Sequence, residues 1–220
     1  MILRESIECV GCGRTDSGVH ARDYYAHFDS ENTNLDGDDD FVYQLNRVLP
    51  RDIAVKKIVL MPENAHARFD AVSRTYEYHV ITGKDAFNDH QAWETRDIAD
   101  VMSMNTAADI LMEYDDFASF CKIGSDQKST KCKLSEAWWM RHGNYLVFTI
   151  TADRFLRNMV RAIVGTLMDV GRGKLSIEDV HAIVKSGDRS EAGQSVPGHG
   201  LYLTRIVYPE LYGLDKEEEV

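Results

Sequence analysis

The chain has 220 residues, which is enough for one large domain or for two small ones that share a core. Its composition is 44% hydrophobic and 28% charged, with four cysteines, which is ordinary for a soluble globular protein and too few thiols for a dense disulfide framework. Neither a signal peptide pattern nor an apolar run of about 18 residues is present. These features exclude a disulfide-rich secreted scaffold and a membrane-spanning protein, and they predict a cytoplasmic location.

The formal net charge of −11 argues at first against a nucleic-acid partner, because Lys and Arg carry phosphate binding. The negative charge is concentrated in two blocks, at residues 36–40 and 215–219, which are typical of a solvated loop and a tail. The arginines gather elsewhere, around residues 14–22, 68–74 and 154–172. A basic face on an acidic protein is therefore compatible with this sequence.

The first third of the chain predicts short strands at residues 6–12, 24–28 and 53–60. Asp40 is expected to cap a helix over residues 41–49, which Pro50 would end. A longer strand is predicted over residues 74–81. Its alternation places Tyr76, Tyr78 and Val80 on one face and the intervening residues on the other.

The rest of the chain predicts a helix at residues 98–112 and a hairpin of strands 135–140 and 145–151, joined at residues 142–144. A long helix over residues 155–170 follows. Ser176 and Asp179 resemble a capping box for a helix at 177–185, and a last strand is expected at 201–208 before a disordered acidic tail. Hairpins mixed with long helices indicate an α+β fold, an antiparallel sheet covered by helices.

The predicted helix at residues 155–170 has an apolar face, and at 100° per residue Arg154, Arg157 and Arg161 lie together on the opposite side. Such a stripe is either a solvated face or an edge that grips phosphate through paired hydrogen bonds. The spacing alone does not decide between these interpretations.

A glycine-rich loop at residues 13–21 follows the first predicted strand, and it places Arg14 two positions before Asp16. Glycine permits a close backbone approach, and a neighbouring cation keeps a carboxylate ionised. A carboxylate of this kind can act as a nucleophile or base towards a ribose carbon. A structural Asx turn tied by a salt bridge is the simpler interpretation of the loop alone.

Five segments in order resemble the motifs of the tRNA pseudouridine synthase I (TruA) family and span nearly the whole chain. They are residues 13–21, residues 67–71 with 74–78, residues 116–120, residues 155–161 with 163–167, and residues 192–193 with 200–203. The resemblance implies that Asp16 is the catalytic aspartate. It also implies that Tyr76 stacks on the target uracil, Arg14 pairs with the aspartate and takes the flipped base's place, Arg161 lines the cleft, and Leu201 forms an apolar wall.

The same resemblance implies isomerisation of uridine to pseudouridine at positions 38–40 of the tRNA anticodon stem-loop, with no cofactor and no metal. The expected RNA-binding residues are Arg22, Arg68, Arg74, Arg154, Arg157 and Arg161. The resemblance further implies a homodimer in which one tRNA touches both subunits. Two related sheet halves are expected, an incomplete one over residues 1–65 that carries the catalytic loop and a second over residues 66–220, with a cleft between them.

Two departures from the family pattern stand out. Only about a dozen residues precede the catalytic signature, whereas a strand and a helix with their loops need on the order of 30–45 residues, so we expect an N-terminally truncated family member. We also expect an unpaired edge beside residues 6–12 for this reason. The second departure is Cys12, where the family carries a small apolar residue. A non-catalytic RNA-binding remnant is therefore the main alternative function.

Two further alternatives are weaker. Cys9 and Cys12 form a C-x-x-C, and Cys121 with Cys132 would complete four thiolates around zinc, but the second pair has the wrong spacing. A carboxylate glycosidase would require two acidic residues that face one substrate, and only Asp16 is singled out by its surroundings.

Overall fold

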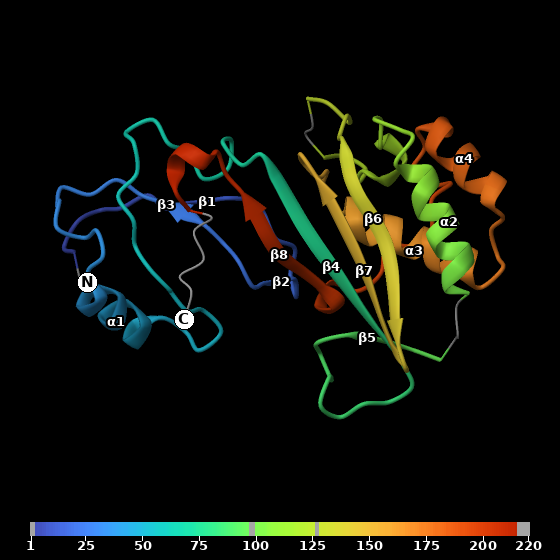
Figure 1. Cartoon of the computed structure of the whole chain (residues 1–220), viewed down its shortest axis with the longest axis horizontal. Helices are drawn as coiled ribbons and strands as arrows, with labels where there is room; N and C mark the ends of the chain where they lie inside the picture. The colour runs from blue at the N-terminus through green and yellow to red at the C-terminus, as the bar shows by residue number, and fades with distance from the viewer. Residues whose placement is uncertain (1–2, 97–99, 126–127, 215–220) are drawn as a thin grey trace. The chain divides into compact units, whose positions relative to one another are not determined.

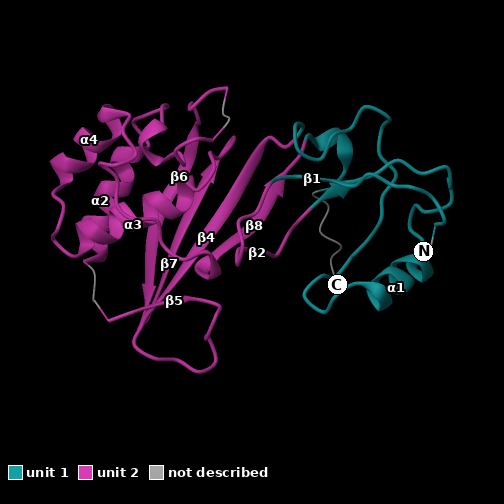
Figure 2. Ribbon diagram, turned by 180° about the vertical axis from the view of Figure 1, so that it is seen from behind, with its two compact units in different colours: residues 1–13, 25–70, 209–220 teal, residues 14–24, 71–208 magenta. Residues whose placement is uncertain are grey.

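The computed structural model describes residues 3–96, 100–125 and 128–214, and these residues pack as two compact units (Figure 2). The first unit comprises residues 1–13, 25–70 and 209–220, and the second comprises 14–24 and 71–208. The expected boundary at 65/66 lies near this division at 70/71. The loop at 14–24, which carries Asp16, is grouped with the second unit. The expected disordered tail at 215–220 lies outside the described residues.

Regular structure is sparse in the first unit. Strand β1 (Val10–Gly11) pairs antiparallel with β3 (Ala26–His27), so the strands expected at 6–12 and 24–28 are reduced to two residues each. The segment 53–60 forms no strand, contrary to the prediction. The Asn46 side chain explains part of this, because its amide accepts from the Val55 N–H at 2.7 Å and donates to the Val55 carbonyl at 2.8 Å. These are the groups that a neighbouring strand would need.

Helix α1 spans Asp39–Val48 and is capped by Asp38 rather than by Asp40, which corrects the prediction. Asp38 has extended backbone angles, and its carboxylate accepts from the Phe41 N–H at 3.0 Å. Asp39 and Asp40 lie in the first turn, where negative charge is favourable beside the N-terminal end of the helix dipole. Helix η3 (Glu210–Tyr212) also belongs to this unit.

A six-stranded sheet organises the second unit, with strand order β2-β8-β4-β7-β6 and β5 beside β4 (Figure 1). The strands are β2 (His20–Ala21), β4 (Ser73–Thr82), β5 (Trp93–Thr95), β6 (Leu134–His142), β7 (Tyr145–Ala152) and β8 (Leu201–Val207). The predicted hairpin of β6 and β7 is confirmed. Most neighbours are antiparallel, whereas β2 with β8 and β4 with β5 are parallel.

Helices α2 (Val101–Leu111), α3 (Met159–Gly171) and α4 (Ile177–Ser186) cover one face of this sheet (Figure 1). Helix α2 starts after its cap, Asp100, and the first residues of the helix predicted at 98–112 lie outside the described part. The capping box of Ser176 and Asp179 is present as predicted. Short helices η1 (Ala118–Phe120) and η2 (Gly198–Gly200) complete the unit. The α+β prediction is confirmed.

Helix α3 starts at Met159, four residues later than predicted. Asn158 explains the difference, because its φ of +67° is left-handed and cannot continue a right-handed helix from the preceding residues. Arg154 and Arg157 therefore precede the helix, and only Arg161 lies on it. The predicted stripe of three arginines along one helix face is wrong.

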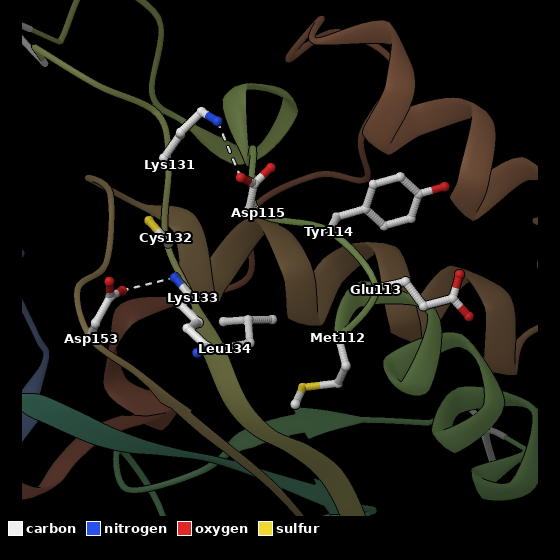
Figure 3. A pocket seen from close by; sticks show the side chains of 9 residues that line it. All are labelled: Met112, Glu113, Tyr114, Asp115, Lys131, Cys132, Lys133, Leu134 and Asp153. Atoms are coloured by element: carbon white, nitrogen blue, oxygen red, sulfur yellow. Dashed lines mark hydrogen bonds and ion pairs between the residues drawn. The ribbon is translucent and has the colours of Figure 1, made fainter.

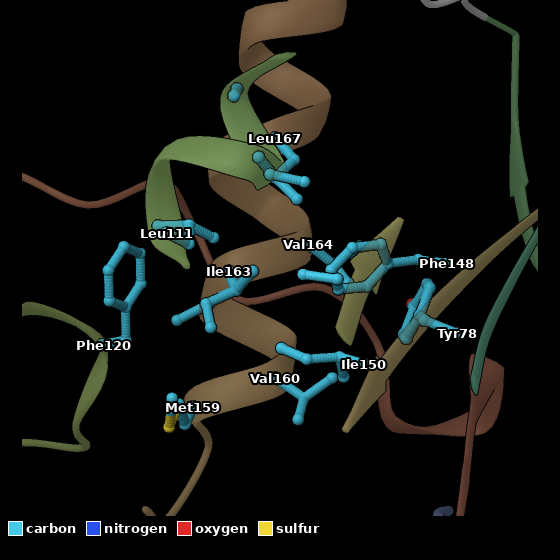
Figure 4. Close-up of a cluster of buried hydrophobic side chains, with 14 of the residues drawn as sticks. Tyr78, Leu111, Phe120, Phe148, Ile150, Met159, Val160, Ile163, Val164 and Leu167 are labelled. Atoms are coloured by element: carbon cyan, nitrogen blue, oxygen red, sulfur yellow. The ribbon is translucent and has the colours of Figure 1, made fainter. Parts of the chain in front are cut away.

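The core lies between the sheet and the three helices (Figure 4). Strand β4 contributes Tyr78 and Val80 to it, as its alternation predicts, and β7 contributes Phe148. The α3 residues of this core are completely or almost completely buried, and they include Met159, Val160, Ile163, Val164 and Leu167. Helix α3 is thus the buried centre of the unit, and everything attached to its N-terminal half is held by this packing.

Two glycines bring α3 into backbone contact with the chain that follows α4. A Cβ on Gly165 would lie 1.9 Å from the Gln194 carbonyl oxygen, and a Cβ on Gly193 would lie 2.7 Å from the Thr166 nitrogen. The Gly193 N–H also donates to the Thr166 hydroxyl at 2.9 Å. Only glycine allows this approach, so residues 193–194 lie directly on the helix.

We expect Gly165→Ala to lower the free energy of unfolding by roughly 3 kcal/mol, the upper end of the usual cost of overpacking. The added methyl group would collide with a backbone atom, which cannot rotate away. Urea unfolding followed by circular dichroism measures the change.

Gly173→Ala is the matched control, because Gly173 has a φ of +69° but nothing within 4 Å of its Cβ position. It should cost only about 1 kcal/mol, for the left-handed backbone. Equal losses of stability in the two variants would show that the close approach at Gly165 does not constrain the fold.

Candidate active site

The turn that carries Asp16 is fixed within the second unit by the residues that follow it. After Asp16, the Val19 N–H donates to the Asp16 carbonyl at 3.2 Å, and β2 then pairs with β8 through His20 and Ala21. The turn packs tightly on η2, since a Cβ on Gly198 would lie 2.6 Å from the Ser17 carbonyl oxygen. Asp16 is therefore presented by a turn whose backbone is held by β8 and η2.

Two arginines surround the Asp16 carboxylate. Arg161 Nη1 donates to Asp16 Oδ2 at 3.0 Å, and Arg157 Nε lies 4.0 Å from Oδ1. The Asp16 side chain is 31% exposed and that of Arg161 is 22% exposed, so the pair is partly shielded from water. Arg161 is itself positioned by Val196, whose carbonyl accepts from Nε at 2.7 Å. The carboxylate is thus held in one orientation with one face open.

The ion pairs of Asp16 in this structure differ from the expected pairing with Arg14. Arg14 is exposed, and among the described residues the cations beside Asp16 are Arg161 and Arg157. Sequence proximity favoured Arg14, but proximity along the chain does not decide which cation contacts a carboxylate. Arg161 is 145 residues distant and reaches Asp16 only because the fold brings the turn before β2 next to the start of α3.

Asp16 lines an open cavity of about 700 Å³. Its walls are formed by Asp16, Ser17, Lys122, Ile123, Asn158, Arg161, Arg189 and Ser195. The volume lies within the range of small-molecule sites and suits a nucleoside. Three cations and one carboxylate line the cavity, so its charge is opposite in sign to that of the whole chain.

The wall behind Arg161 is held by a buried tyrosine. Tyr78 Oη donates to the Pro197 carbonyl at 2.9 Å. Burial raises the pKa of Tyr78 well above its ordinary value, and the nearby Arg161 charge only partly offsets this. Tyr78 therefore stays a neutral donor and fixes the chain just after Val196.

Tyr76 and Leu201 lie outside the lining of this cavity in the described part of the chain. Tyr76 is half-buried on β4, and its ring meets Phe155 edge-on at 5.1 Å. Leu201 is only 6% exposed and belongs to the core beside Tyr78. Tyr76 thus contacts the segment that leads to Arg157, whereas Leu201 supports the site from within.

The other predicted RNA-binding arginines are dispersed. Arg74 Nη1 donates to the Asp153 carbonyl at 3.4 Å, and the adjacent Arg154 is half-buried. Arg22 lies over the Tyr202 ring at 5.3 Å. Arg68 belongs to the first unit and is exposed beside Phe69. Among the predicted arginines, Arg157 and Arg161 are the two whose ion pairs with Asp16 are seen in the described residues.

The sequence predicted Asp16 and Arg161 but missed the other six residues of the cavity, which include Lys122, Asn158, Arg189 and Ser195. Three of these four lie within or beside segments that resemble family motifs, and that proximity was the available signal. Lys122 follows such a segment by two residues. Asn158 is within one, and Ser195 follows another closely.

A second cavity, of about 460 Å³, opens between the end of α2 and the start of β6 (Figure 3). Several of its charged groups already bond within the protein. Lys131 Nζ lies 3.1 Å from Asp115 Oδ2, and the Asp153 carboxylate accepts from the Lys133 backbone N–H at 2.8 Å. Satisfied groups make this cavity a weaker candidate than the one at Asp16.

The four cysteines are free thiols. Cys12 and Cys132 are buried, and burial raises the pKa of the Cys132 thiol to about 12. Within the described ranges, no group of three or more His, Cys, Asp or Glu residues is placed to hold a metal ion.

An α+β unit with an oriented carboxylate in a cationic cavity is suited to an enzyme that acts on an anionic substrate such as a nucleotide. The family model described as tRNA pseudouridine synthase matches residues 107–209. A tRNA pseudouridine synthase A of Parabacteroides distasonis is 50% identical over 211 residues, which cover 96% of this chain and 83% of that protein. The chain belongs to the tRNA pseudouridine synthase family.

Two further relatives carry the same name. A tRNA pseudouridine synthase A of Bacteroides fragilis is 49% identical over 94% of this chain and 82% of its own length. One of Bacillus subtilis is 40% identical over 93% of this chain and 83% of its own length. The predicted family resemblance is thus confirmed. No helix in the described ranges is both long and apolar enough to cross a membrane.

We expect Arg161→Ala to lower the free energy of unfolding by about 1.5–3 kcal/mol, the usual range for hydrogen bonds to charged groups. The variant leaves both the half-buried Asp16 carboxylate and the Val196 carbonyl without this donor. Arg14→Ala should change stability by less than about 0.5 kcal/mol, as exposed substitutions usually do. Urea unfolding of the two variants compares them directly, and a larger loss for Arg14→Ala would contradict the assignment of Arg161.

Proposed function

We propose that this protein converts uridine to pseudouridine at positions 38–40 in the anticodon stem-loop of tRNA, with Asp16 as the catalytic carboxylate. The observation that carries the proposal is the oriented, half-buried Asp16 in a cationic cavity large enough for a nucleoside. Family membership supplies the reaction class, and the motif resemblance supplies the tRNA positions.

The reaction is an isomerisation in which every atom of the base and sugar of the product comes from the substrate nucleotide, apart from exchangeable protons. The bond between C1′ and N1 of uracil breaks, the base turns, and C1′ joins C5, whose proton leaves while N1 gains one. Asp16 would either attack C1′ or take a proton from C2′. Arg161 keeps the carboxylate aimed, because its guanidinium lies 3.0 Å away and is fixed by Val196. Uridines within a stem must first be extruded, at a cost of a few kcal/mol.

The remaining site residues keep the roles that the resemblance suggests, with two adjustments. Tyr76 is proposed to stack on the uracil, and Arg14, which is well exposed, is proposed to enter the stem rather than to hold Asp16. Leu201 would act as a packed support of the uracil pocket, since it is buried.

RNA binding is proposed to depend on arginine contacts to phosphate, in spite of the net charge of −11. The residues proposed are Arg22, Arg68, Arg74, Arg154, Arg157 and Arg161. Local cations displace counterions from RNA whatever the total charge of the protein. The acidic residues at 36–40 belong to the first unit, whereas the Asp16 cavity is built from residues of the second.

We also propose a homodimer located in the cytoplasm. The sheet face opposite the helices supports the dimer, because Trp138 and Met140 on β6 share that face and are 42% and 54% exposed. Large apolar side chains exposed side by side are typical of an interface.

Asp16→Asn should lower the rate of pseudouridine formation by at least about 10²–10⁴-fold, the contribution of a positioned acid–base group. Binding of tRNA should be nearly unchanged, because the amide keeps the shape of the side chain. Release of tritium from tRNA labelled at uridine C5 measures the rate.

Asp115→Asn is the matched control, since Asp115 is exposed and paired with Lys131 near the second cavity. It should retain the parent rate. If the parent protein binds tRNA without converting uridine, it is a non-catalytic RNA-binding protein. An Asp16→Asn variant with the parent rate would show that Asp16 has no part in the mechanism.

The affinity for tRNA should fall steeply with salt, and Arg157→Ala with Arg161→Ala should flatten that dependence. Removing one phosphate interaction should reduce the slope of log K against log salt concentration by roughly 0.7–0.9. Filter binding over a range of salt concentrations gives the slope, after circular dichroism has shown that the variant is folded. Arg141→Ala, at the β6–β7 turn, is the control. An unchanged slope in the double variant would show that these arginines do not contact phosphate.

A further inference from the structure

Three positively charged side chains line the cavity at Asp16: Arg161, Arg189 and Lys122. Arg161 is matched by Asp16, but among the described residues neither Arg189 nor Lys122 lies within ion-pair distance of a carboxylate. The carboxylate next to Arg189 in sequence, Asp188, is occupied by the Ser190 N–H and hydroxyl, both at 2.8 Å. Within the described lining, positive charge therefore exceeds negative charge, which favours an anionic group in the cavity.

Arg189 is held in place rather than free in solvent. It follows Gly187, the left-handed residue that ends α4, and its side chain is half-buried. Its Nη1 donates to the Ala192 carbonyl at 3.2 Å, and its Nη2 donates to Ser195 Oγ at 2.8 Å. The guanidinium has five N–H groups, so donors remain for a ligand in the cavity.

Ser195 connects this arginine to the catalytic side. Its hydroxyl also accepts from Asn158 Nδ2 at 2.6 Å, and Asn158 directly precedes α3. The carbonyl of Val196, the next residue, accepts a hydrogen bond from the Arg161 side chain. The serine thus fixes the spacing between the Arg189 guanidinium and the Arg161–Asp16 pair, which is the arrangement needed to hold two parts of one ligand.

We propose that Arg189 and Lys122 bind a backbone phosphate of the RNA, one of the two phosphodiesters that flank the uridine whose ribose reaches Asp16. The proposal rests on the proposed function. A planar guanidinium with preset donors matches phosphate oxygens, and the exposed Lys122 adds a mobile point charge. Binding this phosphate holds the backbone of the extruded nucleotide while the base is detached and turned. Arg189 and Lys122 are positioning residues in this scheme.

A double-mutant cycle tests the contact. Three anticodon stem-loop RNAs are compared: the natural one, and two with a neutral methylphosphonate linkage on the 5′ or the 3′ side of the target uridine. Binding to the parent protein and to Arg189→Gln is measured by fluorescence anisotropy at constant salt. We expect Arg189→Gln to weaken binding of the natural RNA about tenfold, as expected for loss of a charged hydrogen bond.

The affinity of the parent protein should fall by a similar factor when one of the two linkages is made neutral. The affinity of Arg189→Gln should not fall further with that same linkage, because the effects of changing two groups that contact each other are not additive. The proposal would be overturned if, at both linkages, the loss of affinity caused by the neutral linkage were the same in Arg189→Gln as in the parent. An unchanged affinity of Arg189→Gln for the natural RNA would also overturn it. Arg189→Gln that merely loosens the loop would weaken all three RNAs by the same factor and would also overturn it.

Two controls complete the design. Arg141→Gln removes the same charge at the far end of the β6–β7 hairpin and should leave the affinity within about twofold, as expected for an exposed charge remote from the contact. If Arg189→Gln fails to fold, Lys122→Gln repeats the cycle without changing a contact of Ser195. We expect its effect on affinity to be coupled to the same linkage. If the parent protein neither binds nor converts the natural RNA, the proposed function itself is refuted. If the parent does both and Arg189→Gln shows no coupling, only the phosphate contact is refuted.

Discussion

The contact between α3 and residues 193–194 is the constraint on which the candidate site depends. Gly165 and Gly193 let two backbones touch, and the buried side chains of α3 anchor the helix in the core. From that contact the chain continues through Ser195 and Val196, which bind Arg189 and Arg161. Both cations therefore take their positions from the hydrophobic core rather than from a surface loop.

This arrangement explains how an acidic protein can present a cationic site. Several negative charges of the described chain are engaged in local bonds at caps and turns, as at Asp38, Asp100 and Asp188. Around the cavity, in contrast, cations outnumber carboxylates. Net charge is a property of the whole chain, whereas a ligand responds to the few groups within about a Debye length of it.

Rigidity on one side of the cavity suits chemistry in which a base leaves and returns. Asp16 and Arg161 form a partly shielded pair, so in the proposed reaction little reorganisation would be needed when charge develops on the ribose. Tyr78 remains a neutral donor to Pro197 because burial disfavours its ionised form. A phosphate held by Arg189 would leave the base as the part of the nucleotide that moves.

Sequence alone determined the α+β class, the β6–β7 hairpin, the capping box of α4 and the family, because these depend on local periodicity, on capping chemistry and on motifs in order. It also singled out Asp16, because the loop at residues 13–21 resembles the catalytic motif of the family. The tertiary structure decided that Arg161 and not Arg14 holds Asp16, that Asn158 delays the start of α3, and that Arg189 lines the same cavity. These outcomes depend on residues far apart in the chain that packing brings together, and neither spacing nor propensity carries that information.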